Sequence, residues 1–556
     1  MFSRRSRRWL TFGLGMALAL PVLTPLGKAF AADSTKVDSS KLVKADSAKK
    51  DTVKKDTAAA AAPAAVAAPA APAAPTPDPN GSKTGDINSI PAAKAGAPTL
   101  LELENAVGHN IIATNFVWTL IAGFLVMFMQ AGFALVETGF CRGKNASHTM
   151  FMNFTVYFLG MAGFFFTGYA LMMGNCAGAS TLGGTPTMNG AFSINLLGKP
   201  FQLFGTKGFF LMGDAYDVGA ITLFLFQMVF MDTAVTIPTG AMAERWKTTN
   251  FVLFSFFMSM FVYPIYGNWV WGNGWLAKLG TNFGLGHGHV DYAGSSVVHM
   301  VGGVAALAGA YVLGPRIGKY TRDGKPNAIP GHHIPMAILG TMILGFGWFG
   351  FNAGSSLAGN DLRISIVATN TMLASSSGGM FSMLYMYILT KKFDPSMTVN
   401  GFLAGLVAIT APCAFVNPVS AFIIGAVSGV LVILAAFFIE RKLKIDDPVG
   451  AIAVHGCNGA WGVLSLGLFA DGTYGDGWNG VSGTVKGLFY GDASQFAAQC
   501  IGVLTNFVWV FGCFFIFFKV CDVIWGIRVD KETEVEGLDI PETGVLAYND
   551  FTVSKS

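Results

Sequence analysis

Eleven long apolar segments follow one another from about residue 110, and they constrain the fold of this chain more than any other feature. An α-helix needs about 20 residues to cross the ~30 Å hydrocarbon core of a bilayer, and most of these segments have that length. Charged residues make up only 12% of the chain, against about 25% in soluble domains. The pattern predicts an all-α polytopic membrane protein and excludes an ordinary soluble enzyme or nucleic-acid-binding protein. The segments lie near residues 111–138, 150–173, 218–242, 249–272, 292–313, 333–353, 364–390, 400–416, 419–439, 451–470 and 497–525.

The first 98 residues differ in composition from the apolar body. Residues 1–31 have a basic start, a short apolar stretch and an Ala-Phe-Ala site, which is typical of a cleaved signal peptide. Residues 32–98 are rich in Lys, Ala and Pro, and too few apolar side chains recur there to offset the entropy of ordering. They predict a disordered periplasmic segment. The membrane domain then covers residues 99–528, and residues 529–556 form a cytoplasmic tail.

An odd number of spans places the two mature termini on opposite sides of the membrane. With the N-terminus outside, the loops that become cytoplasmic hold most of the basic residues, among them Arg142, Arg245 and Lys442. This agrees with the positive-inside rule. We therefore expect a multi-pass protein of the cell (inner) membrane with a cytoplasmic C-terminus.

Two segments begin with the same pattern. Asp291–His299 opens the fifth segment and Asp447–His455 opens the tenth, and in each copy a glycine follows the histidine by four residues (Gly303, Gly459). Because the copies are five helices apart, the second enters the membrane from the opposite face. The pattern predicts two inverted five-helix repeats plus a C-terminal helix, with a pore at the repeat interface.

Each aspartate can cap its own helix, and each histidine lies about 12 Å deeper in the membrane. His299 and His455 therefore meet near the bilayer centre, where an ionisable side chain indicates function. The other six histidines fall in loops or near span ends and are predicted to be solvated or to cap loops. Because no carboxylate stands at metal-ligand spacing from the pair, we expect no metal and no cofactor. No nucleophile–base pair or cofactor fingerprint indicates an enzyme.

The chain resembles the ammonium transporter (Amt/Mep/Rh) family, bacterial Amt type, over roughly residues 110–548. The matching segments are Phe226–Phe230, Gly240–Arg245, Trp271–Gly274, Asp291–His299, Trp348–Ser355, Val454–Gly456, Gly526–Val529 and Glu536–Asp539. The resemblance implies a homotrimer of eleven-helix protomers, each with its own pore. It also implies a PII-type signalling protein on the cytoplasmic face, where the loop 316–333 is the longest.

The family pattern also implies roles for individual residues. They are a twin-histidine pore pair (His299, His455), an outer ammonium-recruitment site (Phe226, Trp271, Ser355), a gate of stacked rings (Phe230, Phe351), an acidic residue of structural or outer-site role (Asp291) and a pore-lining ring (Trp348). Aromatic faces attract cations by about 0.5–2 kcal/mol, and a hydroxyl can accept an N–H bond, so the residue types suit ammonium.

The implied function is transmembrane transport of ammonium and ammonia. Ammonium is recruited outside and deprotonated, ammonia crosses a hydrophobic pore, and the proton follows through the twin histidines. Two alternatives stay open: an electroneutral Rh-type gas channel, and an ammonium sensor (transceptor) whose pore does not conduct.

Three features depart from a simple pore. Asp232 lies inside the third segment, where it either pairs with a neighbouring helix or handles protons. The stretch Gly284–His289 is an insertion without an assigned role. The tail carries Thr543-Gly544-Val545 where the family usually has His-Gly-Glu, which leaves tail regulation open.

Overall fold

The computed structural model describes residues 77–81, 84, 98–176, 179–184 and 187–549. All of them belong to one unit, Pro75–Ser556. The predicted signal peptide lies outside the described residues, as does most of the predicted periplasmic segment. The described part of that segment contacts the body, because the Asp78 backbone N–H donates to Asp217 Oδ2 over 3.1 Å, and the Asp78 carbonyl accepts from the Val218 N–H.

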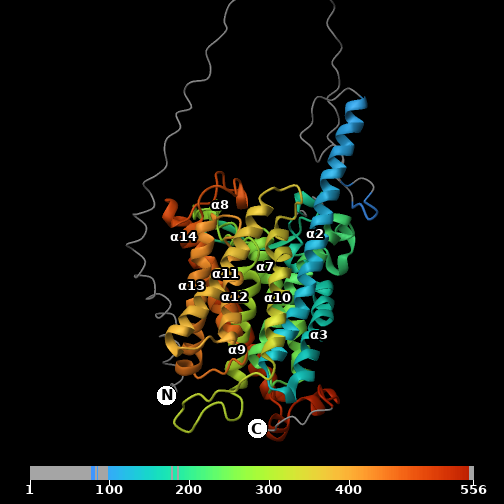
Figure 1. Ribbon diagram of the computed structural model, residues 1–556. Helices are drawn as coiled ribbons and strands as arrows, with labels where there is room; N and C mark the ends of the chain where they lie inside the picture. Colours follow the sequence, from blue (N-terminus) through green and yellow to red (C-terminus); the bar gives the residue numbers. More distant parts are fainter. Residues whose placement is uncertain (1–76, 82–83, 85–97, 177–178, 185–186, 550–556) are drawn as a thin grey trace, which may run out of the picture. The chain divides into compact units, whose positions relative to one another are not determined.

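In the part of the chain that the structure describes, eleven helical elements run side by side through the bundle (Figure 1). The first five are α2 (Pro98–Phe140); α3 (Ala146–Gly163) with η5 (Phe164–Gly168) and α4 (Tyr169–Met173); α5 (Val218–Met242); α6 (Thr248–Phe257) with η9 (Met258–Val262) and α7 (Tyr263–Trp271); and η10 (Ser295–Met300) with α9 (Val301–Leu313). The other six are α10 (Ile334–Asn352) with η11 (Ala353–Ser356); α11 (Ile364–Thr390); α12 (Pro395–Ile409); α13 (Pro418–Phe438) with η12 (Ile439–Leu443); η13 (Ile452–Cys457) with α14 (Asn458–Phe469); and α15 (Ala493–Trp525).

These elements match the eleven predicted segments. Within the described residues, nine of them are long and apolar enough to cross a membrane. The other two are α11, which has 27 residues, and the shorter apolar helix α12, which has 15. The prediction of an all-α polytopic membrane protein is confirmed.

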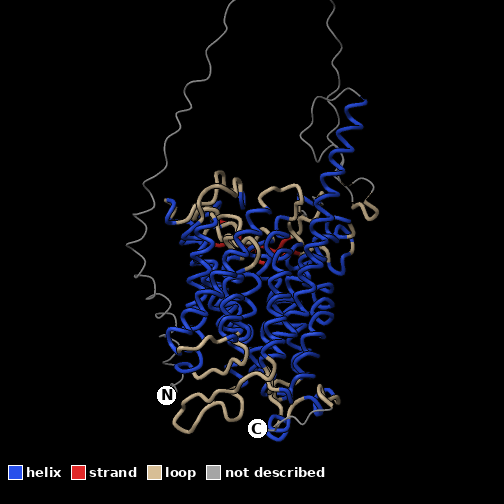
Figure 2. The backbone as a smooth tube through the Cα atoms, in the orientation of Figure 1, coloured by secondary structure: helices blue, strands red, loops and turns tan. Residues whose placement is uncertain are grey.

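Short elements lie in the connections and in the chain after α15. They are η4 (Gly143–Asn145), η6 (Ser180–Leu182), η7 (Phe209–Leu211), η8 (Gly213–Ala215), α8 (Leu279–Phe283), η14 (Trp478–Gly480), η15 (Leu488–Tyr490), α16 (Lys531–Glu536) and η16 (Asp539–Thr543). A β-hairpin of β1 (Ala191–Leu196) and β2 (Lys199–Gly205) lies in the connection before α5 (Figure 2). Its two-residue turn, Leu197-Gly198, has positive φ at both positions, as a type I′ turn requires. The sequence did not lead us to expect this hairpin.

Two span boundaries differ clearly from the prediction. α2 begins at Pro98 and not near residue 111. α12 ends at Ile409 and not near residue 416, because turns take over before Pro412, and proline disfavours helical geometry in the residue that precedes it.

The two inverted halves touch main chain to main chain where they cross. A Cβ atom on Gly303 of α9 would lie 2.1 Å from the Gly456 nitrogen of η13, and one on Gly459 would lie 2.6 Å from the Ser295 carbonyl oxygen of η10. No side chain fits at such distances. Small residues are the usual means of close helix approach in membranes. Here they bring the two predicted histidine-bearing turns together.

One face of the bundle, which we call the inner face, carries a buried group of charges. Glu244 accepts from Arg142 and Arg316, and Arg316 also binds Asp446 through Nε at 2.8 Å and Nη2 at 3.0 Å. We call these four residues the inner charge cluster. Burial favours the neutral carboxyl groups, but it is outweighed jointly by Arg316 and Arg142 at Glu244 and by Arg316 and Arg245 at Asp446, so the pKa values of both carboxyl groups lie below their usual range.

The chain after α15 docks on the same face. Lys144 Nζ donates to the Val535 carbonyl over 2.6 Å, Asn145 Oδ1 accepts from the Leu538 N–H, and Asp539 Oδ1 accepts from the His148 N–H. Arg528 pairs with Glu534 at 2.7 Å. Buried contacts thus join the tail to the start of α3.

Candidate substrate pore

The first histidine-bearing turn is held by its aspartate. Asp291 Oδ1 accepts the N–H groups of Gly294 and Ser295, and Oδ2 accepts those of Ser296 and Val297 together with the Ser296 hydroxyl. Gly294 has φ 114°, a conformation that favours glycine. The carboxylate is 2% exposed and fully used in this cap. The structure therefore gives Asp291 structural contacts, although the resemblance also implied an outer-site role.

The second turn repeats this arrangement. Asp447 Oδ1 accepts from the N–H groups of Gly450 and Ala451, Oδ2 accepts from that of Ile452, and Gly450 has φ 82°. In both copies the aspartate is followed after three residues by a left-handed glycine, and then by a π-helix that contains the histidine. In Figure 1, α9 and α14 continue from these turns toward opposite ends of the bundle.

His299 and His455 meet in the interior. Their Nδ1 atoms are 3.2 Å apart, their ring centroids are 5.3 Å apart, and the rings are inclined by 25°. Both side chains are buried, and His299 Nε2 has no hydrogen-bond partner among the described residues. A single N–H must lie between two facing Nδ1 atoms if both rings are neutral. The pair then presents one donating and one accepting Nε2, the arrangement that passes a proton.

A continuous stack of buried rings leads to this pair. The ring centroids of Phe226 and Phe230 are 4.6 Å apart, and those of Phe230 and Phe351 are 4.1 Å apart with an angle of 27° between the ring planes. The centroids of Phe351 and His299 are 5.2 Å apart. Trp348 stacks on His299 at 5.1 Å and 19°, and its Nε1 donates to Thr410 Oγ1. The side chains of these four residues, Phe226, Phe230, Phe351 and Trp348, are each at most 2% exposed. The structure thus brings the gate, the pore-lining ring and the twin histidines together.

The other two predicted recruitment residues lie at the more exposed end of the stack. Trp271 packs edge-on against Phe230 at 6.2 Å, and its Nε1 donates to the Asp291 carbonyl over 2.6 Å. The Ser355 hydroxyl donates to the Phe351 carbonyl over 2.7 Å, which leaves its lone pairs free to accept. Both residues are half-buried, unlike the rings behind them.

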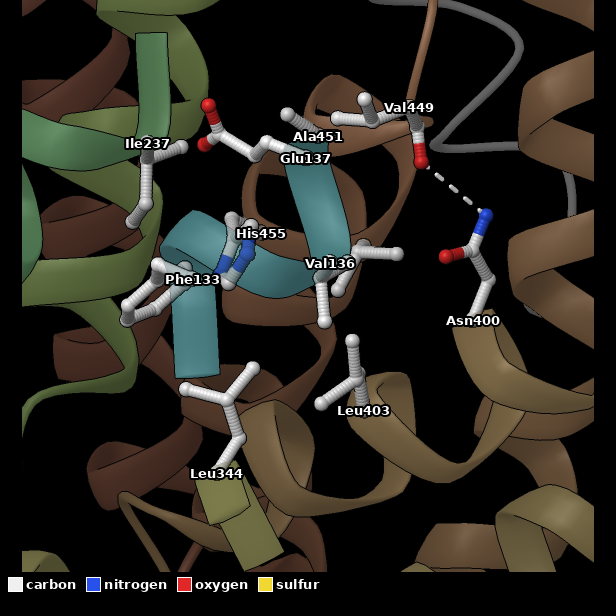
Figure 3. A pocket seen from close by; sticks show the side chains of 11 residues that line it. Phe133, Val136, Glu137, Ile237, Leu344, Asn400, Leu403, Val449, Ala451 and His455 are labelled. Atoms are coloured by element: carbon white, nitrogen blue, oxygen red, sulfur yellow. Dashed lines mark hydrogen bonds between the residues drawn. The ribbon is translucent and has the colours of Figure 1, made fainter. Parts of the chain in front are cut away.

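A cavity lies on the other side of the pair, toward the inner face (Figure 3). Its lining residues are Phe133, Val136, Glu137, Ile237, Leu344, Asn400, Leu403, Val449, Ala451, Val454 and His455. Phe133 lies 6.0 Å from the His455 ring. The Glu137 carboxylate accepts from Asn153 Nδ2 over 2.8 Å and Thr239 Oγ1 over 2.7 Å.

Sequence reasoning missed Phe133 and Glu137. The signal was present, because Glu137 is an ionisable residue inside the first predicted segment and Phe133 lies one turn before it on the same helix face.

Asp232 lies apart from this path. It is 2% exposed in α5 and does not line the cavity, and its Oδ1 has no hydrogen-bond partner among the described residues. The Tyr157 side chain lies close enough to interact electrostatically with Asp232, and none of the described Lys, Arg or His side chains forms an ion pair with it.

The insertion Gly284–His289 folds back on α15. The His287 N–H donates to Gln495 Oε1, and His289 Nε2 lies 3.0 Å from the Ser296 hydroxyl that binds Asp291. Burial lowers the pKa of His289 to about 4, so this ring is neutral at physiological pH. His148, His287 and His289 are buried by tertiary contacts and not solvated, although His287 Nε2 lies 2.8 Å from the Gly483 carbonyl oxygen of another loop, as the loop-capping alternative predicted. His333 does cap α10, since its Nδ1 accepts from the Met336 N–H.

The described residues hold no group of three or more His, Cys, Asp and Glu side chains that suits a metal ion. What the site offers is therefore a ring-lined path with an imidazole pair inside it.

Residues 117–548 match the family model described as Ammonium Transporter Family. The chain belongs to this family. Ammonium transporter Amt2 of Archaeoglobus fulgidus is 45% identical over 463 residues, which are 83% of this chain and 92% of that protein. Ammonium transporter Amt1 of Haloferax mediterranei is 36% identical over 459 residues, 80% of this chain and 81% of that protein.

Solved structures agree with the membership in the ammonium transporter family. One titled Sensor Amt Protein is 37% identical with a TM-score of 0.67, and the match covers 78% of this chain and 99% of that one. The crystal structure of Candida albicans Mep2 is 27% identical with a TM-score of 0.62, over 76% and 87% of the two chains. The protein is thus a multi-pass membrane protein of the ammonium transporter family.

Proposed function

We propose that this protein moves ammonium across the cell membrane as ammonia plus a relayed proton, with a net transfer of one positive charge. The observation that carries the proposal is the His299–His455 pair, which is buried, linked Nδ1 to Nδ1 at 3.2 Å, and placed behind a stack of aromatic rings.

Recruitment takes place at the half-buried end of the stack. Trp271 and Phe226 supply aromatic faces for the cation, and the Ser355 lone pairs accept one N–H bond. Family membership supports ammonium as the cation.

The stack itself favours a neutral passenger. Phe230 and Phe351 lie ring on ring at 4.1 Å, so they must turn aside for each molecule. An unpaired charge between apolar walls is costly, whereas ammonia is small and uncharged. Ammonium therefore loses its proton before the gate, and ammonia passes on alone.

The proton follows through the imidazoles. One ring accepts it at Nε2 and the hydrogen bond between the Nδ1 atoms shifts. The second ring then releases a proton at its own Nε2 toward the inner cavity. Proton and ammonia recombine beyond the pair.

The test is an ammonium pulse on purified full-length protein in vesicles on a solid-supported membrane. We expect a transient current that saturates with ammonium concentration and is absent from protein-free vesicles. Saturable uptake without current would favour the electroneutral Rh-type gas channel instead.

The second candidate is an ammonium sensor, favoured by the similarity to the structure titled Sensor Amt Protein. A pore that binds without conducting would give tight ammonium binding, for example by calorimetry, with neither current nor uptake.

We further propose the assembly that the resemblance implies. It is a homotrimer in the inner membrane, with the signal peptide removed, the mature N-terminus outside and the inner face toward the cytoplasm. Arg142, Arg245 and Arg316 on the inner face agree with the positive-inside rule. A PII-type signalling protein would then meet the loop 316–333 and the docked tail.

A further inference from the structure

Glu137 is a buried carboxylate that the proposed mechanism has not yet used. It lies near the end of α2, 3% exposed, and shares one cavity with His455 (Figure 3). Leu344, Leu403 and Val454 make most of the remaining wall apolar. The cavity is large enough to hold one water molecule, and Glu137 and His455 are polar groups that such a water can bridge.

No cation compensates this carboxylate. Among the described residues, no Lys, Arg or His nitrogen lies within ion-pair distance of Glu137. Its hydrogen bonds come from neutral groups, since Asn153 Nδ2 and Thr239 Oγ1 both reach Oε2 and the Gly240 backbone N–H also interacts with the carboxylate. Asp447, which interacts electrostatically with Glu137, is occupied by the backbone N–H groups of its own turn.

An unpaired carboxylate in such a place is stable in two forms. It is either protonated or balanced by a bound cation, because an isolated buried charge costs many kcal/mol. Exchange between these two forms is the reaction that the exit of ammonia requires.

We propose that Glu137 is the acid that turns ammonia back into ammonium at the inner end of the pore. The proton released at the outer site travels through His299 and His455 and is taken up by the Glu137 carboxylate. Ammonia arriving in the cavity accepts that proton, so the O–H bond of the acid breaks and an N–H bond forms. Ammonium departs, and the carboxylate awaits the next relayed proton.

This step balances. One ammonium ion with its single positive charge enters from outside, and one ammonium ion with the same charge leaves at the inner end. Thr239 and Asn153 hold Oε2 and the Gly240 N–H also interacts with the carboxylate, and the four lone-pair sites of a carboxylate still leave one that can take up and release the proton.

The inference rests on the proposed function, and Glu137→Gln in full-length protein tests it. The carboxamide oxygen still accepts from Asn153 and Thr239, so we expect the protein to assemble normally. The ammonium current should fall by at least about tenfold, since a positioned general acid is worth about 10²–10⁴ in rate. Neutral ammonia should still enter, and a pH-sensitive dye inside the vesicles should report alkalinisation faster than in protein-free vesicles.

Asp232→Asn is the matched control. It makes the same chemical change to a buried carboxylate in α5 that does not line the cavity, and we expect current near the wild-type level. Glu137→Asp covers the case in which the glutamine variant does not assemble. It keeps an ionisable acid, and we expect it to keep a measurable current.

Each contrary result has a distinct meaning. Wild-type current in Glu137→Gln overturns the inference alone. Loss of both current and ammonia entry in an assembled glutamine variant also overturns it, because that is the outcome of a blocked pore. An assembled Glu137→Asp variant without current overturns it as well. A wild-type protein without ammonium current overturns the proposed function, and the inference falls with it.

Discussion

Two imidazoles that share one hydrogen bond behave differently from two that stand alone. His299 is enclosed by Trp348, Phe351 and His455, so any charge on the pair is shielded from water and soon released. We therefore expect both rings to be neutral at rest, since an ionised side chain at the bilayer centre costs at least about 2.5–3.5 kcal/mol on insertion scales.

Replacing both rings tests the relay. His299→Ala with His455→Ala should abolish the ammonium current and leave the proposed trimer intact in detergent, because removal of both partners leaves no unsatisfied polar group between them. Potassium current is measured beside it, since the enlarged cavity offers a path to hydrated cations. A double mutant with wild-type ammonium current that still excludes potassium would show that the proton takes another route.

In the proposed mechanism, recruitment of ammonium depends on Trp271. Trp271→Leu removes one aromatic face, so half-saturation should weaken by about 2- to 30-fold, which corresponds to a cation–π contribution of about 0.5–2 kcal/mol. Discrimination against methylammonium should also decline. Trp275→Leu is the matched control, because Trp275 stacks on Phe201 and contacts none of the pore rings. An unchanged concentration dependence in Trp271→Leu would place the outer site elsewhere.

At the scale of the helices, the inner charge cluster holds together the end of α5, the end of α9 and the turn before η13. Asp446 receives three hydrogen bonds from Arg316, including one from its backbone N–H. Breaking a buried pair of this kind typically costs about 3–5 kcal/mol, because the remaining charge loses its partner. The cluster therefore stabilises the ends of helices that belong to both halves.

The cluster predicts an acid limit to stability. The folded pKa of Asp446 lies below its unfolded value of about 3.8, so its contribution is complete above that pH and is lost as the pH falls through the folded value. Asp446→Asn should lower the midpoint of thermal unfolding at pH 7. Because the variant has no carboxylate to protonate at this position, it should lose less additional stability than the wild type as the pH falls below about 4. The measurement is thermal unfolding in detergent over a pH series. Parallel curves for the two proteins would contradict the role given to Asp446.

The helices themselves could be predicted from the sequence because hydropathy and residue spacing are local. α11 spans Ile364–Thr390, as its segment did, and the repeated Asp–His spacing located η10 and η13. The hairpin could not be predicted this way, because β1 is exposed along its length and carries no buried–exposed alternation. Burial of His148 and His289 likewise depends on residues about a hundred or more positions away, such as Thr248 and Gly502.

The candidate site divides in the same manner. The rings and the histidines share recognisable motifs, whereas the inner cavity joins α2, α5, α10, α12 and η13, which no local pattern connects. Glu137 could have been predicted in the same way as Asp232, because both are carboxylates inside apolar segments, where an ionisable residue indicates function.

At the scale of the whole molecule, Asp78 is the N-terminal residue whose contacts with the membrane domain are described, through Asp217 and Val218. Deleting residues 32–74 keeps the contacts of Asp78 with Asp217 and Val218, so we expect the proposed trimer and the ammonium current to stay near normal. Size-exclusion chromatography and current recordings of the shortened protein check this. Loss of the trimer would mean that residues 32–74 help to hold the body together.

Main-chain contact between Gly303 and Gly456 removes the room in which one half of the protein could rock against the other. Rocking of domains takes microseconds to milliseconds, whereas side-chain rotations are far quicker. In the proposed mechanism, turnover then depends on rotation of the Phe230 and Phe351 rings and on proton transfer between the imidazoles. The transport rate should therefore depend little on the viscosity of the surrounding lipid. Lipid viscosity slows proteins whose domains must move within the bilayer.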